Sequence, residues 1–190
     1  MLSFQVGMMG GSTLKFKEAK LTSVNVVNND ITQVKADALI TAINPSGLWF
    51  GGLDSAIQRT SGTQFHAQAQ AAMPLKDGQV VFAPALAATN GAFDAVLFVV
   101  DELKTPLYEL VIVTLEEAVK HELMQVSIPT IRTGVMAGVF EPRQKALSDL
   151  GIAVNDFVQK NPGKLDAINI VVYSNEGDRM FLRQLCDSSY

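Results

Sequence analysis

Short apolar segments alternate with longer amphipathic segments along most of the 190-residue chain. The apolar segments are rich in Val and Ile and have the length of buried strands. They comprise residues 21–28, 36–43, 79–85, 94–100, 124–131 and 167–173, and a further edge strand is predicted at 13–17. The amphipathic segments repeat their apolar residues at helical spacing. Helices are therefore predicted over 52–73, with a break at Gly62, and over 106–123, 142–160 and 176–186.

This alternation of strands and helices is typical of an α/β protein. It predicts a three-layer α/β/α sandwich with a central, mostly parallel mixed sheet of about six strands. No repeat or linker divides the sequence, so residues 1–190 are expected to form one domain, with 1–19 as an N-terminal extension or edge strand. In such folds ligands bind beyond the carboxyl ends of the strands, where loops lead into helices. A site is therefore expected in the loops at 44–52 and 132–142.

Charge and cysteine content narrow the classes of partner. The net charge is −4 and the basic residues are spread along the chain, which disfavours a nucleic-acid groove. No segment approaches the roughly 18 to 20 apolar residues of a membrane span, and the first residues lack a signal-peptide pattern. The single cysteine, Cys186, excludes an intrachain disulfide and is expected to be a small apolar residue of the last helix rather than a nucleophile. A reducing, cytoplasmic location without a membrane partner is expected.

Two loops carry glycines just before predicted helices. The first, "NPSGLWFGG", begins with Asn44 and leads into the helix at Leu53. The second, "RTGVMAGVFEP", covers residues 132–142. Glycines at a helix N-terminus let backbone N–H groups approach an anion, and the helix dipole favours negative charge there, so the two loops together suit a diphosphate. For each loop taken alone, the alternative is that its glycines only allow the chain to turn into the helix and bind no anion. Neither loop contains a P-loop or the Gly-x-Gly-x-x-Gly motif of dinucleotide-binding proteins.

Taken in order, five segments resemble the macrodomain family of ADP-ribose-binding proteins. They are "NDIT" at 29–32, "ADALITAIN" at 36–44, "GGLDSAI" at 51–57, "SIPTIRTGV" at 127–135 and "INIVVYSNE" at 168–176, so the resemblance extends over about residues 20–186. The chain departs from the family pattern at Thr41, which replaces an asparagine, and at Trp49 and Phe50, which replace part of a glycine run. It departs again at Arg132, which replaces a serine.

At the adenine end, the resemblance implies roles for five residues. Asp30 would accept a hydrogen bond from the adenine amino group, and Ile31 would pack nearby. Tyr173 would pack against the adenine, while Ser174 and Asn175 would reach the proximal ribose or the edge of the base. From the residues alone, Asp30 could instead cap its own loop, and Tyr173 could be an ordinary strand aromatic.

The resemblance also implies two candidate catalytic residues at the distal ribose. Asn44 would hold the ribose hydroxyls, and Asp54 would activate a water molecule or the ribose itself. Met136 or Phe140 would cover this ribose. From the residues alone, Asn44 is a turn residue and Asp54 a first-turn carboxylate, which the helix dipole stabilises by roughly 0.3 to 1 kcal/mol.

Between the two ends, the glycine-containing loops would bind the diphosphate. The residues implied for this contact are Gly51, Gly52, Leu53, Thr133, Gly134, Val135 and Gly138. Arg132 could bind a phosphate as a bidentate donor, or it could form a salt bridge elsewhere.

Three functions are compatible with these residues. The first is hydrolysis at the distal ribose of a mono-ADP-ribosyl ester, O-acetyl-ADP-ribose or ADP-ribose 1-phosphate. The second is a non-catalytic module that recognises free ADP-ribose, a related nucleotide or an ADP-ribosylated protein. In the third, the fold is kept without the ligand, and Trp49 and Phe50 fill the pocket or form a surface for a partner. No cofactor or metal is expected, since no His, Cys and carboxylate set has ligand spacing. The two histidines, His66 and His121, are expected to face solvent.

Overall fold

The central sheet of the computed structural model is mixed and mostly parallel. The structure describes residues 21–46, 52–134 and 137–187, so the edge strand expected at 13–17 lies outside the described residues. Within the described part, the strands are β1 (Ser23–Asn28), β2 (Ala36–Ile43), β3 (Val80–Pro84), β4 (Phe93–Val100), β5 (Gln125–Pro129) and β6 (Ala167–Val172). Their order is β1-β6-β5-β2-β4-β3, and β3 alone among these runs antiparallel to its neighbour.

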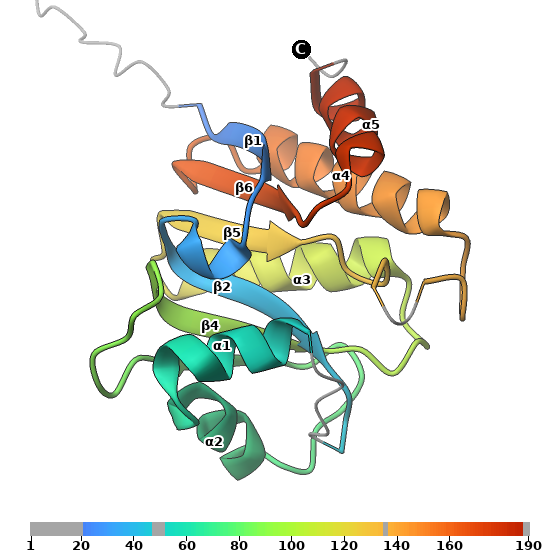
Figure 1. Ribbon diagram of the computed structural model, residues 1–190. Coiled ribbons are helices and arrows are strands. Elements are labelled where there is room, and N and C mark those ends of the chain that lie inside the picture. Colours follow the sequence, from blue (N-terminus) through green and yellow to red (C-terminus); the bar gives the residue numbers. More distant parts are fainter. Residues whose placement is uncertain (1–20, 47–51, 135–136, 188–190) are drawn as a thin grey trace, which may run out of the picture.

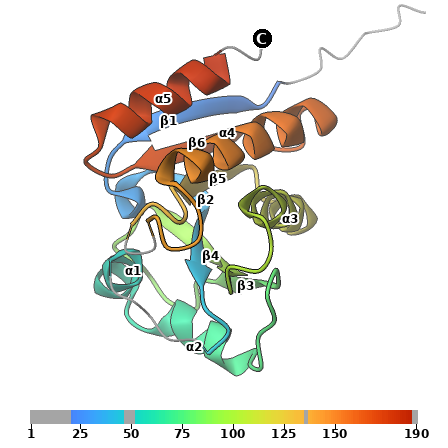
Figure 2. The ribbon, with the colours of Figure 1, turned by 90° about the vertical axis from the view of Figure 1, so that its right-hand side faces the viewer.

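Helices cover both faces of this sheet. They are α1 (Leu53–Ser61), α2 (Gln64–Ala71), α3 (Leu107–Lys120), α4 (Arg143–Lys160) and α5 (Glu176–Asp187), and a 3-10 turn, η1, spans Ile31–Gln33. The predicted break between α1 and α2 is confirmed at Gly62, whose φ of 63° lies in the left-handed region that glycine tolerates. The views show α1 and α2 on one side of β2 and β4 and α3 on the other side (Figures 1 and 2). The predicted three-layer sandwich is therefore confirmed.

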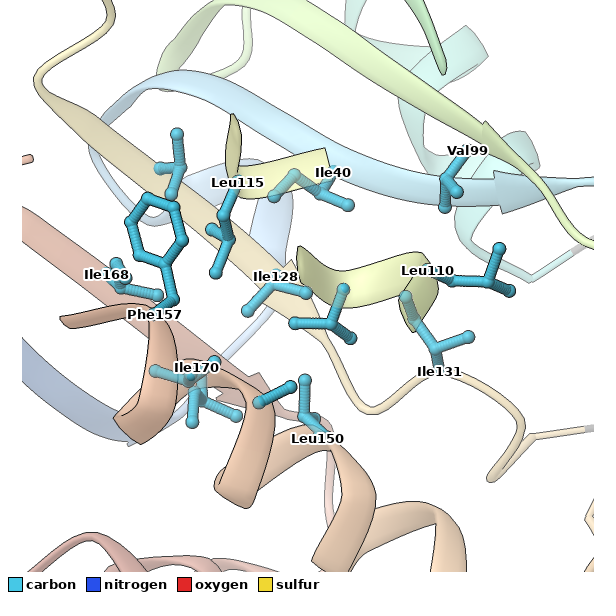
Figure 3. Packing of buried hydrophobic residues seen from close by; sticks show 14 of the residues in the cluster. Ile40, Val99, Leu110, Leu115, Ile128, Ile131, Leu150, Phe157, Ile168 and Ile170 are labelled. Atoms are coloured by element: carbon cyan, nitrogen blue, oxygen red, sulfur yellow. The ribbon is translucent and has the colours of Figure 1, made fainter. Parts of the chain in front are cut away.

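The central strands are apolar throughout because each face is buried against helices. Leu39 and Val96 pack with α1 and α2, whereas their chain neighbours Ile40 and Leu97 pack with the helices of the opposite face. On that second face, side chains from α3 and α4 point toward the sheet residues (Figure 3). This two-sided burial explains why 36–43 and 94–100 appear in the sequence as nearly continuous apolar runs. None of the described helices is both long and apolar enough to cross a membrane.

Cys186 lies on α5 and is buried against the second face of the sheet, as the sequence predicts. Burial raises the pKa of its thiol from 9.0 to about 11, and the nearby charge of Asp187 acts in the same direction. The thiol is therefore protonated at neutral pH and a poor nucleophile.

Alkylation should report this burial directly. We expect iodoacetamide at pH 8 to modify Cys186 slowly in the native protein, because a pKa of about 11 leaves on the order of one thiolate in a thousand. In urea the same thiol should react rapidly, since its pKa returns to its ordinary range. Mass spectrometry of samples quenched over time measures both rates. Equal rates in the native and unfolded protein would contradict the burial of this side chain.

Candidate ligand-binding site

Two cavities flank the first turn of α1 at the carboxyl end of the parallel strands. The larger has a volume of about 540 Å³ and contacts Gly52 and Leu53, while the smaller, of about 290 Å³, contacts Asp54. Thr130 follows β5 and lines the larger cavity, and Asn44 follows β2 and lines the smaller one. The site expected at the strand ends therefore exists as two hollows on either side of a helix N-terminus.

The larger cavity brings together the residues expected at the adenine end with several that sequence reasoning missed. Its lining comprises Asn29, Asp30, Ile31, Gly52, Leu53, Ser55, Ala56, Arg59, Pro129, Thr130, Val171 and Tyr173. Ala56 and Arg59 follow Gly52 at intervals of four and three residues, which places them on one face of α1. Helical spacing from the glycine run could therefore have identified them.

Asp30 lines the larger cavity and also caps η1. Its Oδ1 accepts hydrogen bonds from the backbone N–H of Thr32 at 2.9 Å and from the Thr32 hydroxyl at 2.8 Å. The loop-capping interpretation of this aspartate is thus what the structure shows. The cap holds the carboxylate at the cavity wall, so the same residue can also serve a ligand.

Tyr173 lies just beyond β6 and is 76% exposed. It therefore belongs to the wall of the larger cavity and not to the core of the sheet. The two residues after it take local roles: the backbone N–H of Ser174 donates to Asn28 Oδ1 at 3.2 Å, and Asn175 Oδ1 accepts from the backbone N–H of Asp178 at 3.0 Å. The latter bond caps the start of α5. Neither Ser174 nor Asn175 lines the larger cavity.

The smaller cavity holds both candidate catalytic residues. Asn44 Oδ1 accepts a hydrogen bond from the hydroxyl of Ser46 at 2.9 Å. Asp54 is 8% exposed in the first turn of α1, and its Oδ1 lies 3.4 Å from Nε2 of His66 on α2. Asp101 and Glu102 also line this cavity and were missed. Neither belongs to a glycine-containing loop, so the sequence carried no signal for them.

The expectation that both histidines face solvent is wrong. His66 is 2% exposed and packs edge-on against the ring of Phe98, with 5.2 Å between ring centroids. His121 is partly buried, stacks on Phe82 at 3.9 Å and contacts Glu117 Oε1 through Nε2 at 3.1 Å. Polar sequence neighbours suggest exposure, but the fold places His66 of α2 and His121, just beyond α3, against phenylalanine rings of the sheet.

Arg132 is a buried anchor between three segments. Its Nε and one terminal nitrogen donate to the two carboxylate oxygens of Asp101 at 2.9 and 2.8 Å. It also donates to Glu141 Oε1 at 3.0 Å and to the carbonyl of Thr105 at 2.8 Å. Burial lowers the pKa of the guanidinium, but the hydrogen bonds and charges of Asp101 and Glu141 outweigh burial and raise it. Of the two alternatives for Arg132, the structure shows the salt bridge.

The second loop is shaped around this anchor. Arg132 has a φ of 63°, which is unusual for a residue other than glycine. The Cζ atom of its guanidinium lies 5.1 Å from the centroid of the Phe140 ring, a cation–π contact. The hydroxyl of Thr133 donates back to the carbonyl of Thr130 at 2.7 Å. Gly134 and Gly138 are exposed, and Gly138 has a φ of 73°.

Five residues on which the sequence predictions rest lie outside the described part of the chain. Gly51 and Val135 are implied for the diphosphate and Met136 for the distal ribose, and these assignments stay predictions. The other two are Trp49 and Phe50, whose expected effect on the pocket also stays a prediction.

No protein-family model matches the chain, but individual relatives do. An O-acetyl-ADP-ribose deacetylase from Citrobacter rodentium is 26% identical over 174 residues, which cover 85% of this chain and 94% of that protein. The ADP-ribose glycohydrolase MACROD2 of Xenopus laevis is 25% identical over 179 residues, which cover 90% of this chain. The chain spans only 42% of the length of that relative.

Solved structures agree with this fold. The Trypanosoma brucei macrodomain in complex with ADP superposes with a TM-score of 0.75 at 20% identity, covering 90% of this chain and 72% of that one. The Oceanobacillus iheyensis macrodomain with ADP gives a TM-score of 0.73 at 22% identity and covers 90% and 93% of the two chains. The sheet order and these superpositions lead to one conclusion: the chain has the fold of the macrodomains, and its sequence resembles enzymes that act on ADP-ribose compounds.

Proposed function

We propose that the chain binds ADP-ribose or a close derivative across the first turn of α1 and hydrolyses it at the distal ribose. The observation that carries this proposal is the pair of cavities on either side of one helix N-terminus. Unpaired N–H groups and the positive end of the helix dipole suit a diphosphate at that point. The names of the relatives, a deacetylase and a glycohydrolase of ADP-ribose compounds, support the same ligand.

The larger cavity suits the adenine. Asp30 supplies a carboxylate that selects an exocyclic amino group over a carbonyl, and Tyr173 supplies an exposed aromatic ring. Ile31 and Ala56 add apolar contact at the wall. A purine with an amino group therefore fits this cavity, because its ring can pack against Tyr173 and its amino group can donate to Asp30.

The smaller cavity suits the distal ribose and the bond to be cleaved. The amide of Asn44 can hold ribose hydroxyls, and the buried carboxylate of Asp54 can accept a proton from a water molecule or from the ribose. Catalysis would then rest on positioning and on electrostatic stabilisation at this end. Substrates of this kind are a mono-ADP-ribosyl ester, O-acetyl-ADP-ribose and ADP-ribose 1-phosphate.

A non-catalytic reader of ADP-ribosylated proteins is the alternative function. It is favoured by Thr41, which is buried on β2 where the family pattern has an asparagine. This difference leaves one side-chain amide fewer for a reacting ribose. Both functions share the ligand, and we propose a cytoplasmic location for either, in keeping with the single, buried and free thiol.

Calorimetric titration with ADP-ribose, ADP and AMP tests the shared ligand. We expect ADP-ribose to bind more tightly than ADP, because the distal ribose adds contacts in the smaller cavity. At ligand near a hundred times Kd, binding should stabilise the fold by ~2.7 kcal/mol. A thermal melt should then shift upward by roughly 5 to 10 °C. An absence of binding at millimolar ADP-ribose would reject the proposal and leave a macrodomain fold with a different role.

The Asp30→Asn variant should weaken binding of ADP-ribose and AMP alike, by about tenfold, because a hydrogen bond to a charged acceptor loses its charge. Asparagine retains an oxygen that can accept the two Thr32 hydrogen bonds, so the cap of η1 should persist. Calorimetry with both ligands measures the change. Asp94→Asn controls for the loss of one negative charge, because Asp94 is exposed near the start of β4 and lines neither cavity. Unchanged affinities in Asp30→Asn would place the adenine elsewhere.

A further inference from the structure

Outside the residues that contact either cavity, the structure holds a buried histidine directly behind a candidate catalytic residue. We propose that His66 is a positioning residue that fixes the carboxylate of Asp54 at the distal-ribose end of the ligand. This inference rests on the proposed function, because it assigns the distal ribose to the smaller cavity.

The fold brings the two residues together from consecutive helices. Asp54 lies in the first turn of α1, and His66 lies in the first turn of α2, which follows the break at Gly62. Nε2 of His66 then lies 3.4 Å from Oδ1 of Asp54. The Asp54 side chain reaches the smaller cavity, whereas His66 does not line it. The imidazole is therefore placed to act on a ligand only through the carboxylate.

The imidazole itself is held rigidly. Its residue is 2% exposed, and its ring packs edge-on against Phe98 of β4 at 5.2 Å between centroids. The neighbours Phe65 and Ala69 of α2, and Ile57 of α1, belong to the hydrophobic core that α1 and α2 form with the sheet. A ring enclosed in this way cannot swing, so its Nε2 is a fixed point for the carboxylate.

Packing alone does not explain a histidine at this position. The buried neighbours on α2 are apolar, and an apolar side chain at 66 would serve the contact with Phe98 without any cost of burying polar atoms. A buried imidazole gains its stability by hydrogen bonding. With a proton on Nε2, His66 donates to Oδ1 of Asp54, and Oδ2 then serves a ribose hydroxyl or a water molecule.

Two substitutions separate positioning from packing. His66→Leu keeps an apolar side chain in the core but removes the donor, whereas His66→Gln keeps a donor near the position of Nε2. We expect His66→Leu to reduce the affinity for ADP-ribose about five- to tenfold and to leave the affinity for ADP unchanged, because ADP lacks the distal ribose. His66→Gln should restore most of the ADP-ribose affinity. Calorimetry with both ligands, after a thermal melt confirms folding, gives these values.

A purely structural role would move both ligands together. If His66→Leu weakens ADP and ADP-ribose equally, or if His66→Gln restores nothing, His66 does not position Asp54 and the inference is overturned. If the unsubstituted protein binds no ADP-ribose, the proposed function fails, and the ligand role of His66 fails with it.

Nuclear magnetic resonance tests the pair itself without any ligand. Long-range ¹⁵N–¹H correlation should show His66 with its proton on Nε2, and Asp54→Asn should shift both ring nitrogens. His121, which contacts Glu117 on α3, serves as the internal reference and should not change. A proton on Nδ1 alone, or no response to Asp54→Asn, would overturn the pairing even in a protein that binds ADP-ribose well.

Discussion

Replacing Arg132 with methionine is expected to lower the free energy of unfolding by about 3 to 5 kcal/mol, because it leaves the buried carboxylate of Asp101 without its cation and leaves Glu141 with Lys145 alone. Asp101 would lose two hydrogen bonds and Glu141 one, and the Thr105 carbonyl would lose its donor. For a domain of this size the melting temperature should fall by roughly 6 to 20 °C. Urea denaturation and thermal melts measure the two quantities independently.

Matched variants identify the cause of this loss. Arg132→Lys keeps the charge but not the fork that binds both oxygens of Asp101, so it should recover only part of the stability. Arg179→Met breaks an exposed pair with Glu176 on α5 and should leave the melting temperature nearly unchanged. If Arg132→Met melts like the unsubstituted protein, the buried anchor contributes nothing. Should it instead lose ADP-ribose affinity at full stability, Arg132 contacts a phosphate after all.

The Asp54→Asn variant should lose turnover by about two to four orders of magnitude, because an amide cannot take a proton from the attacking group. The variant keeps the shape of the side chain and can still contact His66, so the Kd for ADP-ribose should rise by no more than about tenfold, far less than the loss of turnover. Chromatographic release of ADP-ribose from an ADP-ribosyl ester, and of acetate from O-acetyl-ADP-ribose, measures the rates. Phosphate release from ADP-ribose 1-phosphate tests the remaining substrate.

The same assay decides between a hydrolase and a reader. A reader binds ADP-ribose but turns over none of the three substrates, so Asp54→Asn has no rate to lower. Glu109→Gln, a change at an exposed position on α3 that lines neither cavity, should keep the rate of the unsubstituted protein. A hydrolase whose rate survives Asp54→Asn would need a different base, and the role assigned to Asp54 would be wrong.

The elements of this fold are well predicted by local patterns. Strand β2 has the predicted bounds, since both of its faces are buried and its apolar run is uninterrupted. Strand β4 begins at Phe93, one residue before the predicted segment, and it is also buried along nearly its whole length. Helix α4 begins directly after Pro142, the residue at which the helix is predicted to start. The direction of a strand is not predictable in this way. Strand β3 pairs antiparallel with β4 at the edge of the sheet, and no pattern in its own sequence indicates that direction.

The candidate site is only partly predictable, because its parts are joined across long sequence distances. Asp30, Ile31 and Tyr173 could be proposed from the family resemblance, and the fold brings them into one cavity. For Arg132, the sequence left a phosphate contact and a salt bridge open. The structure shows the salt bridge, with Asp101 as a partner 31 residues away in the sequence. No local sequence pattern predicts that partner.

The sequence by itself determined the alternation of strands and helices and the positions of the two glycine-containing loops, because periodicity and turn chemistry act between near neighbours. Only the tertiary structure decided where polar side chains point. His66 lies among glutamines in the sequence and was expected in solvent, yet the face of α2 that carries Phe65 and Ala69 buries it beside Asp54. Burial depends on which face of a short helix meets the sheet, and the turn at Gly62 sets that orientation for α2.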